Sequence, residues 1–153
     1  MTDHYRKLFE YESWANNEIA DCIAGTDDAP GKAVSLMSHI INAQTIWLDR
    51  LKNNTSAVKV WQEYNKDELQ DKLKYSSDKF SEFLNTLSDK DLINVITYSN
   101  TRGEKFDTEM SDILNHLSHH SAYHRGQIIT LMKPFLSDVP FTDYILYVRN
   151  IKK

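Results

Sequence analysis

The chain contains the stretch Asn115-His116-Leu117-Ser118-His119-His120-Ser121-Ala122-Tyr123-His124-Arg125-Gly126-Gln127, which holds four of its six histidines. No proline interrupts this stretch, so it predicts one continuous helix. On a helical wheel of about 100° per residue, His120 lies about 40° and His124 about 80° from His116. The apolar residues of the helix project at about 60° to 120°, so His120 and His124 point with the core face. His119 points away from that face, and His116 lies at its border.

The i, i+4 spacing of His120 and His124 favours a shared ligand. Two such imidazoles are neighbours on a helix surface, and helical metalloprotease motifs bind zinc with the same spacing. A buried imidazole without a partner is costly, so each needs a metal, a carboxylate or a backbone carbonyl. The spacing alone leaves two interpretations open, a metal site and a pair of hydrogen-bonded core histidines. A His116/His120 pair has the same spacing and is a further alternative.

Composition places the chain among ordinary globular proteins. With 153 residues, 41% hydrophobic and 26% charged, it predicts one domain spanning residues 1–153 with a proper core. The net charge of −4 argues against nucleic acid as the main partner. A single cysteine excludes an intramolecular disulfide and fits a reducing cytoplasm. Neither a secretory signal nor an apolar run long enough to span a bilayer is visible, so we expect a cytoplasmic protein without a membrane partner.

Helical periodicity recurs along the chain and defines the expected fold class. Amphipathic patterns predict four long helices, at about 3–24, 32–51, 66–87 and 107–132. Two segments rich in β-formers, at 94–98 and 104–107, predict a small hairpin before the last long helix. Residues 140–148 are expected to form a short fifth helix or an extended segment covering one end of the bundle. The sequence therefore predicts an all-α protein, an up-down four-helix bundle with an inserted β-hairpin and a short C-terminal helix or segment.

His39 lies in the second predicted helix, at the edge of its buried arc. Its own surroundings favour a border residue that is hydrogen-bonded to a neighbouring side chain. It becomes a candidate ligand only if the second helix packs beside the helix that carries His120 and His124. Bundle cores commonly build metal sites from facing helices in this way.

Four segments and the position of the predicted hairpin give the chain a family resemblance. The segments are Trp14-Ala15-Asn16-Asn17, Ser38-His39-Ile40-Ile41-Asn42, Trp47-Leu48-Asp49-Arg50-Leu51 and His120-Ser121-Ala122-Tyr123-His124-Arg125-Gly126-Gln127, the last matching a His-x-x-x-His-Arg-Gly-Gln signature. The chain resembles the DinB/YfiT-like family over nearly its whole length. The resemblance implies a four-helix bundle, often a homodimer, with a divalent metal held by three histidines. Carried over by position, these ligands are His39, His120 and His124.

A three-histidine site implies chemistry. Three neutral ligands leave a dication with its full charge and at least one open position, where it lowers the pKa of bound water or thiol. Imidazole suits several metals, and the resemblance favours zinc or nickel. Within the resembled family, activities include transfer reactions of low-molecular-weight thiols such as bacillithiol or mycothiol, so a small-molecule thiol is the expected substrate. A metal-dependent hydrolase and a non-catalytic metal-binding or stress-response protein are the alternatives.

Several other residues are candidates for roles around the metal. Gln127 projects near the histidines and could orient a ligand, with a helix-packing hydrogen bond as the alternative. Tyr123 could donate from its phenol, although core packing is its simpler role. Asn17 and Trp14 are candidates to line a pocket above the metal, with Trp14 more simply a core residue. No catalytic residue is assigned beyond these.

Three further residues carry expectations of their own. Arg125 points opposite the histidines, so we expect it to form a structural ion pair. Gly126 costs stability inside a helix, and close approach of another helix is the natural explanation. Asp143 is a candidate for a fourth position on the metal, although a structural role is favoured.

Overall fold

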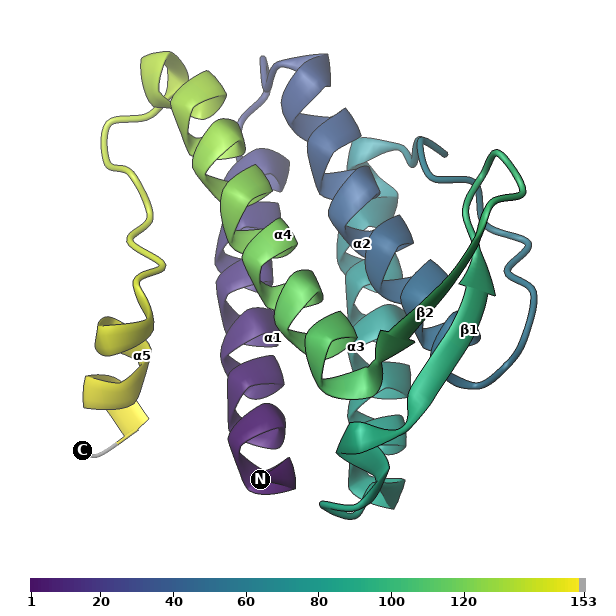
Figure 1. Cartoon of the computed structure of the whole chain (residues 1–153). Coiled ribbons are helices and arrows are strands. Elements are labelled where there is room, and N and C mark those ends of the chain that lie inside the picture. Colours follow the sequence, from purple (N-terminus) through teal and green to yellow (C-terminus); the bar gives the residue numbers. More distant parts are fainter. Residues whose placement is uncertain (152–153) are drawn as a thin grey trace.

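Four long helices and one hairpin make up the computed structural model, which describes residues 1–151 (Figure 1). The long helices are α1 (Thr2–Ala24), α2 (Gly31–Leu51), α3 (Leu69–Thr86) and α4 (Met110–Met132). The hairpin strands are β1 (Val95–Ser99) and β2 (Lys105–Glu109), and a short helix, α5 (Tyr144–Ile151), follows the bundle. The predicted four-helix bundle with a hairpin before the fourth long helix is confirmed.

The helices pack so that α2 lies against α4 and α3, while α1 lies against α3 and α4. A long connection, residues 52–65, followed by a short 3-10 helix, Lys66–Glu68, joins the lower end of α2 to the upper end of α3 (Figure 1). The helix directions are therefore up, down, down and up, and strict alternation does not hold between α2 and α3. This arrangement places α2 directly beside α4, which is the condition that His39 needed to become a ligand candidate.

The apolar core is divided into two clusters. One is built around residues such as Phe9, Phe80 and Leu114, and the other around residues such as Ile19, Met37 and Ile128. On α4, the buried residues of the first cluster end at Leu117, and those of the second resume at Ile128. On α1 and α4 buried polar residues lie between the two clusters, and on α2 they adjoin the second cluster. The buried members of this polar layer are Glu12, Asn16, Ser38, His39, Asn42, Ser121 and Arg125.

The hairpin corrects the predicted start of the fourth helix. Residues 107–109 were expected to begin that helix, but they pair antiparallel with residues 95–97 and extend β2 to Glu109. The strand side chain of Ile96 is buried against the bundle, and Gly103 takes a φ of 81° in the turn. A positive φ costs glycine nothing, so Gly103 permits the tight return. Helix α4 consequently begins at Met110.

The C-terminal segment forms a helix, α5, which lies beside α1 rather than over an end of the bundle (Figure 1). Tyr144 contacts Tyr11 edge-to-face, and Tyr147 packs against both Tyr11 and Trp14. The Tyr11 hydroxyl donates a 2.7 Å hydrogen bond to the carbonyl of Thr142. These aromatic contacts hold the segment against the outer side of α1.

Within residues 1–151, no helix combines the length and the apolar character that a bilayer span requires.

Candidate metal centre

Three histidines from two adjacent helices converge in the polar layer. His39 on α2 faces His120 and His124 on α4, and one nitrogen from each ring lies within 4.8 Å of the others. The closest pair is His39 Nε2 and His120 Nε2, which are 3.0 Å apart. His39 is buried and the other two are half-buried. The group arises because α2 packs against α4 and because His120 and His124 lie one turn apart.

The tautomer of His39 is set by the connection between α2 and α3. His39 Nδ1 lies 3.0 Å from the carbonyl oxygen of Val60. A carbonyl oxygen only accepts, so Nδ1 carries the hydrogen and Nε2 keeps a lone pair directed at the other histidines. The ring of Trp61 stacks on the His39 imidazole at 4.0 Å and 9°. His39 is thus oriented by a carbonyl at its outer nitrogen and an indole on its face, as metal-binding histidines commonly are.

Two α2 side chains fix this part of the connection. Asn42 Nδ2 donates to the carbonyl of Gln62 at 2.7 Å, and Ser38 Oγ accepts the backbone N–H of Tyr64 at 3.2 Å. Ser38 precedes His39, and Asn42 lies one turn after it. The Val60 carbonyl and the Trp61 ring are therefore anchored to the same turns of α2 that carry the ligand candidate.

His124 is oriented in the same way by its own helix. Its Nδ1 lies 2.7 Å from Oε1 of Gln127, so the imidazole donates and the amide oxygen accepts. This leaves a lone pair on His124 Nε2. Gln127 thus contacts a ligand candidate directly. Tyr123 contacts the His124 ring edge-to-face at 5.1 Å, but its side chain is 66% exposed, so the core-packing role expected for it is wrong.

Burial keeps His39 and His120 neutral. The pKa of His120 is lowered to about 3, first because burial disfavours the charged ring and then because His124, His39 and His116 are close. The pKa of His39 is lowered as well, chiefly by burial, against the opposing effect of the Val60 hydrogen bond. Neutral imidazole is the form that binds metal, so both rings are in the required protonation state at neutral pH.

The donor set fits a divalent metal ion. Zinc–nitrogen bonds of about 2.0–2.1 Å in a tetrahedral site place two ligand nitrogens about 3.3 Å apart, close to the 3.0 Å between His39 and His120. Without a metal, His120 Nε2 must carry the hydrogen of this contact, because His39 already has its hydrogen on Nδ1. A metal ion would require His120 to move that hydrogen to Nδ1. The three-histidine group could therefore hold a metal ion, with no preference for one element.

The remaining two histidines of α4 lie outside this group. The His116 ring is 5.6 Å from that of His120 and packs against Trp47 at 5.5 Å. His119 is exposed. Among the residues that the structure describes, the group that could hold a metal is His39, His120 and His124. His116 is not part of it, so the structure favours this group over the alternative His116/His120 pair.

The candidates on α1 and at the C-terminus lie elsewhere. Asn17 donates from its side chain to the carbonyl of Ser13 in its own helix. Trp14 packs against Tyr147 of α5, so it does not cover the histidines. Asp143 precedes α5, which lies against the outer side of α1. Asn17 and Trp14 thus contact Ser13 and Tyr147, and the pocket above the metal stays a prediction; Asp143 is not part of the histidine group.

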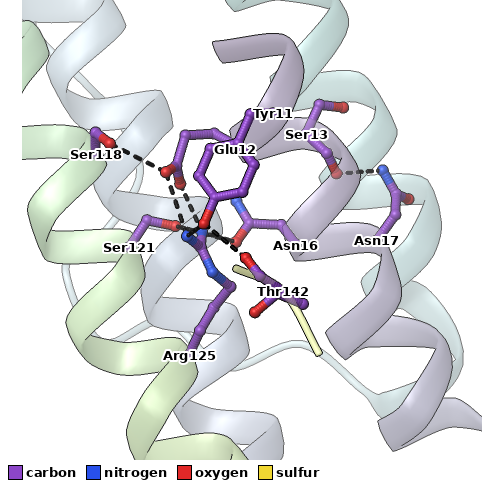
Figure 2. Close-up of polar contacts among 9 residues, drawn as sticks. All are labelled: Tyr11, Glu12, Ser13, Asn16, Asn17, Ser118, Ser121, Arg125 and Thr142. Atoms are coloured by element: carbon purple, nitrogen blue, oxygen red, sulfur yellow. Dashed lines mark hydrogen bonds and ion pairs between the residues drawn. The ribbon is translucent and has the colours of Figure 1, made fainter. Parts of the chain in front are cut away.

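Arg125 forms the ion pair expected for it, on the face of α4 turned to α1 (Figure 2). Its Nη1 lies 2.6 Å from Glu12 Oε2, and the two side chains are only 2% and 4% exposed. The same guanidinium donates to Asn16, Ser121 and Tyr11, and Ser118 donates to Glu12. His120 lines a cavity of about 10 Å³ together with Glu12 and Asn16 of this network.

Gly126 corrects another expectation. A Cβ atom added at this position would meet nothing within 4 Å, so no helix approaches it closely. Sequence reasoning also missed Val60 and Trp61, which lie in an irregular connection without periodicity. The adjoining segment of α2, with Ser38 and Asn42, carried the family resemblance and could have pointed to them.

Comparisons with known proteins complete this description. No curated protein and no solved structure gives a significant match. The model of the DinB family matches residues 1–151, which is nearly the whole chain and includes all three histidines. The chain therefore belongs to the DinB family.

Proposed function

We propose that this protein is a divalent-metal-dependent enzyme whose metal is held by His39, His120 and His124. The observation that carries the proposal is their convergence, with the outer nitrogens of two rings already donating to fixed oxygens. Such an arrangement directs the Nε2 lone pairs of His39 and His124 inward before any metal binds. Zinc or nickel is the proposed ion because imidazole is a good ligand for both.

The proposed reaction is transfer of a low-molecular-weight thiol, of the bacillithiol or mycothiol type, to an electrophile. When bound, the metal would supply Lewis-acid chemistry that lowers the pKa of a thiol and so favours its nucleophilic form. Three neutral ligands support this, because they leave the ion its full charge. Within the described residues, no carboxylate joins the histidine group. An open position for a small molecule follows from that ligand set.

The chain itself contributes positioning and shielding. Val60 and Gln127 hold the outer nitrogens of two histidines, and Trp61 covers one face of His39. The neighbouring apolar clusters exclude water from the ends of the polar layer. We assign no general acid or base, and Tyr123 is the exposed hydroxyl nearest in sequence to a ligand candidate.

A metal-dependent hydrolase is the nearest alternative, because the same open position could take water. A non-catalytic metal-binding or stress-response protein is the alternative from another class. A protein ligand in the fourth position would favour that reading, but Asp143, the residue considered for it, directly precedes α5 and is not part of the histidine group. The structural observations therefore give more support to an open site.

The activity test uses untagged protein loaded with zinc or with nickel. Each low-molecular-weight thiol is incubated with 1-chloro-2,4-dinitrobenzene, and thioether formation is followed by absorbance. We expect metal-dependent turnover that His120→Ala abolishes and His119→Ala leaves unchanged. Hydrolysis of p-nitrophenyl acetate without thiol transfer would replace the proposal by the hydrolase. Full metal occupancy without either reaction would favour the non-catalytic protein.

The proposal includes a homodimer acting in the reducing cytoplasm, as the family resemblance and the single cysteine favour. Light scattering coupled to size-exclusion chromatography measures the assembly directly. A mass close to twice 17.8 kDa is the expected result, and a mass of one chain would contradict it.

A further inference from the structure

A groove of about 740 Å³ lies beside the histidine site. Its walls are the C-terminal half of α2, the connection 53–61 and the end of the hairpin. In Figure 1 this connection and the hairpin stand on the same side of the bundle. The volume is within the range of small-molecule sites, and the three walls come from separate parts of the chain.

The charge of the groove is opposite to that of the chain. Arg50, Lys59 and Lys105 line it, and none of the lining residues is Asp or Glu. The chain as a whole has more acidic than basic residues, with a net charge of −4. A concave surface with three cations in an acidic protein creates a local field that attracts anions.

Arg50 is held in place by two aromatic rings and a backbone carbonyl. Its guanidinium lies over the rings of Trp47 and Tyr98 at 4.5 and 4.9 Å, and Nη2 donates to the carbonyl of Ser99 at 3.1 Å. Burial lowers its pKa, so the charge is partly desolvated. Within residues 1–151, no carboxylate lies within ion-pair distance of it. A half-buried guanidinium held by rings and a carbonyl still has donors for an oxyanion.

Trp61 connects the groove to the histidine site. Its indole lines the groove and also stacks on His39. Arg50 follows His39 by 11 residues on α2, which corresponds to about 16 Å along a helix. A ligand with its acidic group at Arg50 and an apolar part against Trp61 would therefore extend toward the histidines.

We propose that this groove binds the anionic part of the substrate, an extended organic molecule whose carboxylate or phosphate pairs with Arg50. The lysines 59 and 105 add long-range attraction, and Trp61 and Tyr98 contact the apolar part. The link between this ligand and catalysis rests on the proposed function. Binding in the groove itself requires no metal, so the groove proposal and the proposed metal-dependent function can be contradicted independently of each other.

The test compares probes that differ in charge alone. 4-Phenylbutyrate and 4-phenylbutyramide are titrated into the full chain, before and after metal removal, by isothermal calorimetry. Phenylphosphonate distinguishes a phosphate-type from a carboxylate-type preference. We expect the carboxylate to bind about tenfold or more tightly than the amide, as a charge-assisted hydrogen bond predicts. Metal removal and His120→Ala should leave this ratio unchanged.

Substitutions in the groove test whether it causes the difference in affinity between 4-phenylbutyrate and 4-phenylbutyramide. Arg50→Gln should reduce this affinity ratio to within about twofold, and Arg50→Lys should retain part of it because the charge stays. Lys105→Gln, at an exposed strand position that disturbs no packing, should lower it by a smaller factor. Lys7→Gln removes the same charge from α1 and should change nothing. Equal binding of the acid and the amide, or an unchanged ratio in both Arg50→Gln and Lys105→Gln, would overturn the proposal.

Discussion

Two faces of α4 carry pairs of polar side chains, His120 with His124 and Ser121 with Arg125, and the surroundings of the two pairs differ. Ser121 and Arg125 face α1, where Glu12 and Asn16 satisfy them in a closed network. The face carrying His120 and His124 meets His39, and one nitrogen from each ring converges there; within residues 1–151 no carboxylate joins this group. Both pairs have i, i+4 spacing, so spacing does not distinguish them.

The difference lies in what each face still needs. The guanidinium of Arg125 donates to four different side chains, and its charge is paired with Glu12. The histidine face has acceptors directed at one another and a single hydrogen between His39 and His120. A complete network stabilises and orients the helix, whereas convergent lone pairs on neutral rings are the arrangement that a metal ion completes.

The largest expected effect is a loss of stability from a substitution on the face of α4 that carries Arg125. Arg125→Met leaves the buried Glu12 carboxylate without its cation, with the Ser118 hydroxyl as its remaining side-chain donor, so the free energy of unfolding should fall by about 3–5 kcal/mol. Urea unfolding measures this change. Lys79→Met breaks the exposed pair with Glu82 and should change the free energy of unfolding far less, because solvent screens that pair. A loss below 1 kcal/mol for Arg125→Met would show that the buried network is not a stabilising unit.

The next effect is on the histidine face. Gln127→Leu removes the acceptor for His124 Nδ1 and should weaken metal binding by about 10- to 100-fold. Gln127→Glu keeps an acceptor and should retain most of the affinity. Competition with a chromophoric chelator measures both constants. Equal affinities for the Leu variant and the parent protein would mean that Gln127 only packs the helix.

The pH dependence of the metal-free protein follows from the lowered pKa values of His39 and His120. Below about pH 6.5 these histidines bind protons in the unfolded chain but stay neutral in the folded protein. The free energy of unfolding therefore decreases as the pH is lowered. The slope reaches about 1.4 kcal/mol per pH unit for each histidine that stays neutral. Urea unfolding at a series of pH values measures this dependence. Between pH 6.5 and 4, His120→Asn should reduce the slope of the free energy of unfolding against pH by the amount that corresponds to roughly one proton. An unchanged slope in this variant would contradict the conclusion that His120 stays neutral in the folded protein.

The smallest effect is at the exposed Gly126, between His124 and Gln127. Because the space around its Cβ position is open, Gly126→Ala should raise the free energy of unfolding by about 0.5–1 kcal/mol. Thermal and urea unfolding both report it, and metal affinity should not change. Destabilisation by this substitution would reveal a close contact that a single chain does not contain.

The helices and two of the histidines could be predicted from the sequence because both follow from periodicity. Residue spacing determines which side chains share a helical face, so His120 and His124 were separated from His119 without a structure. His39 required knowledge of which helices are neighbours. The direction of α3 depends on the connection 52–65, whose path has no periodic signal, and the family resemblance supplied the pairing instead.

The features that the sequence did not predict depend on contacts between distant segments, which leave no pattern in the local sequence. Trp61 and Val60 reach His39 only because the connection is pinned to α2 by Ser38 and Asn42. Residues 107–109 could have continued either a strand or a helix, and cross-strand pairing decided the outcome. Tyr123 lies close to the histidines on the wheel, but its side chain extends into solvent.

Metal content tests the central claim most directly. Untagged protein is purified without added metal and without a nickel column, and its elements are measured together with those of the His39→Ala, His120→Ala, His124→Ala, His119→Ala and His4→Ala variants. We expect about one divalent ion per chain in the parent, His119→Ala and His4→Ala proteins, and near-complete loss in the other three. Full metal occupancy in folded His120→Ala protein would contradict the three-histidine site.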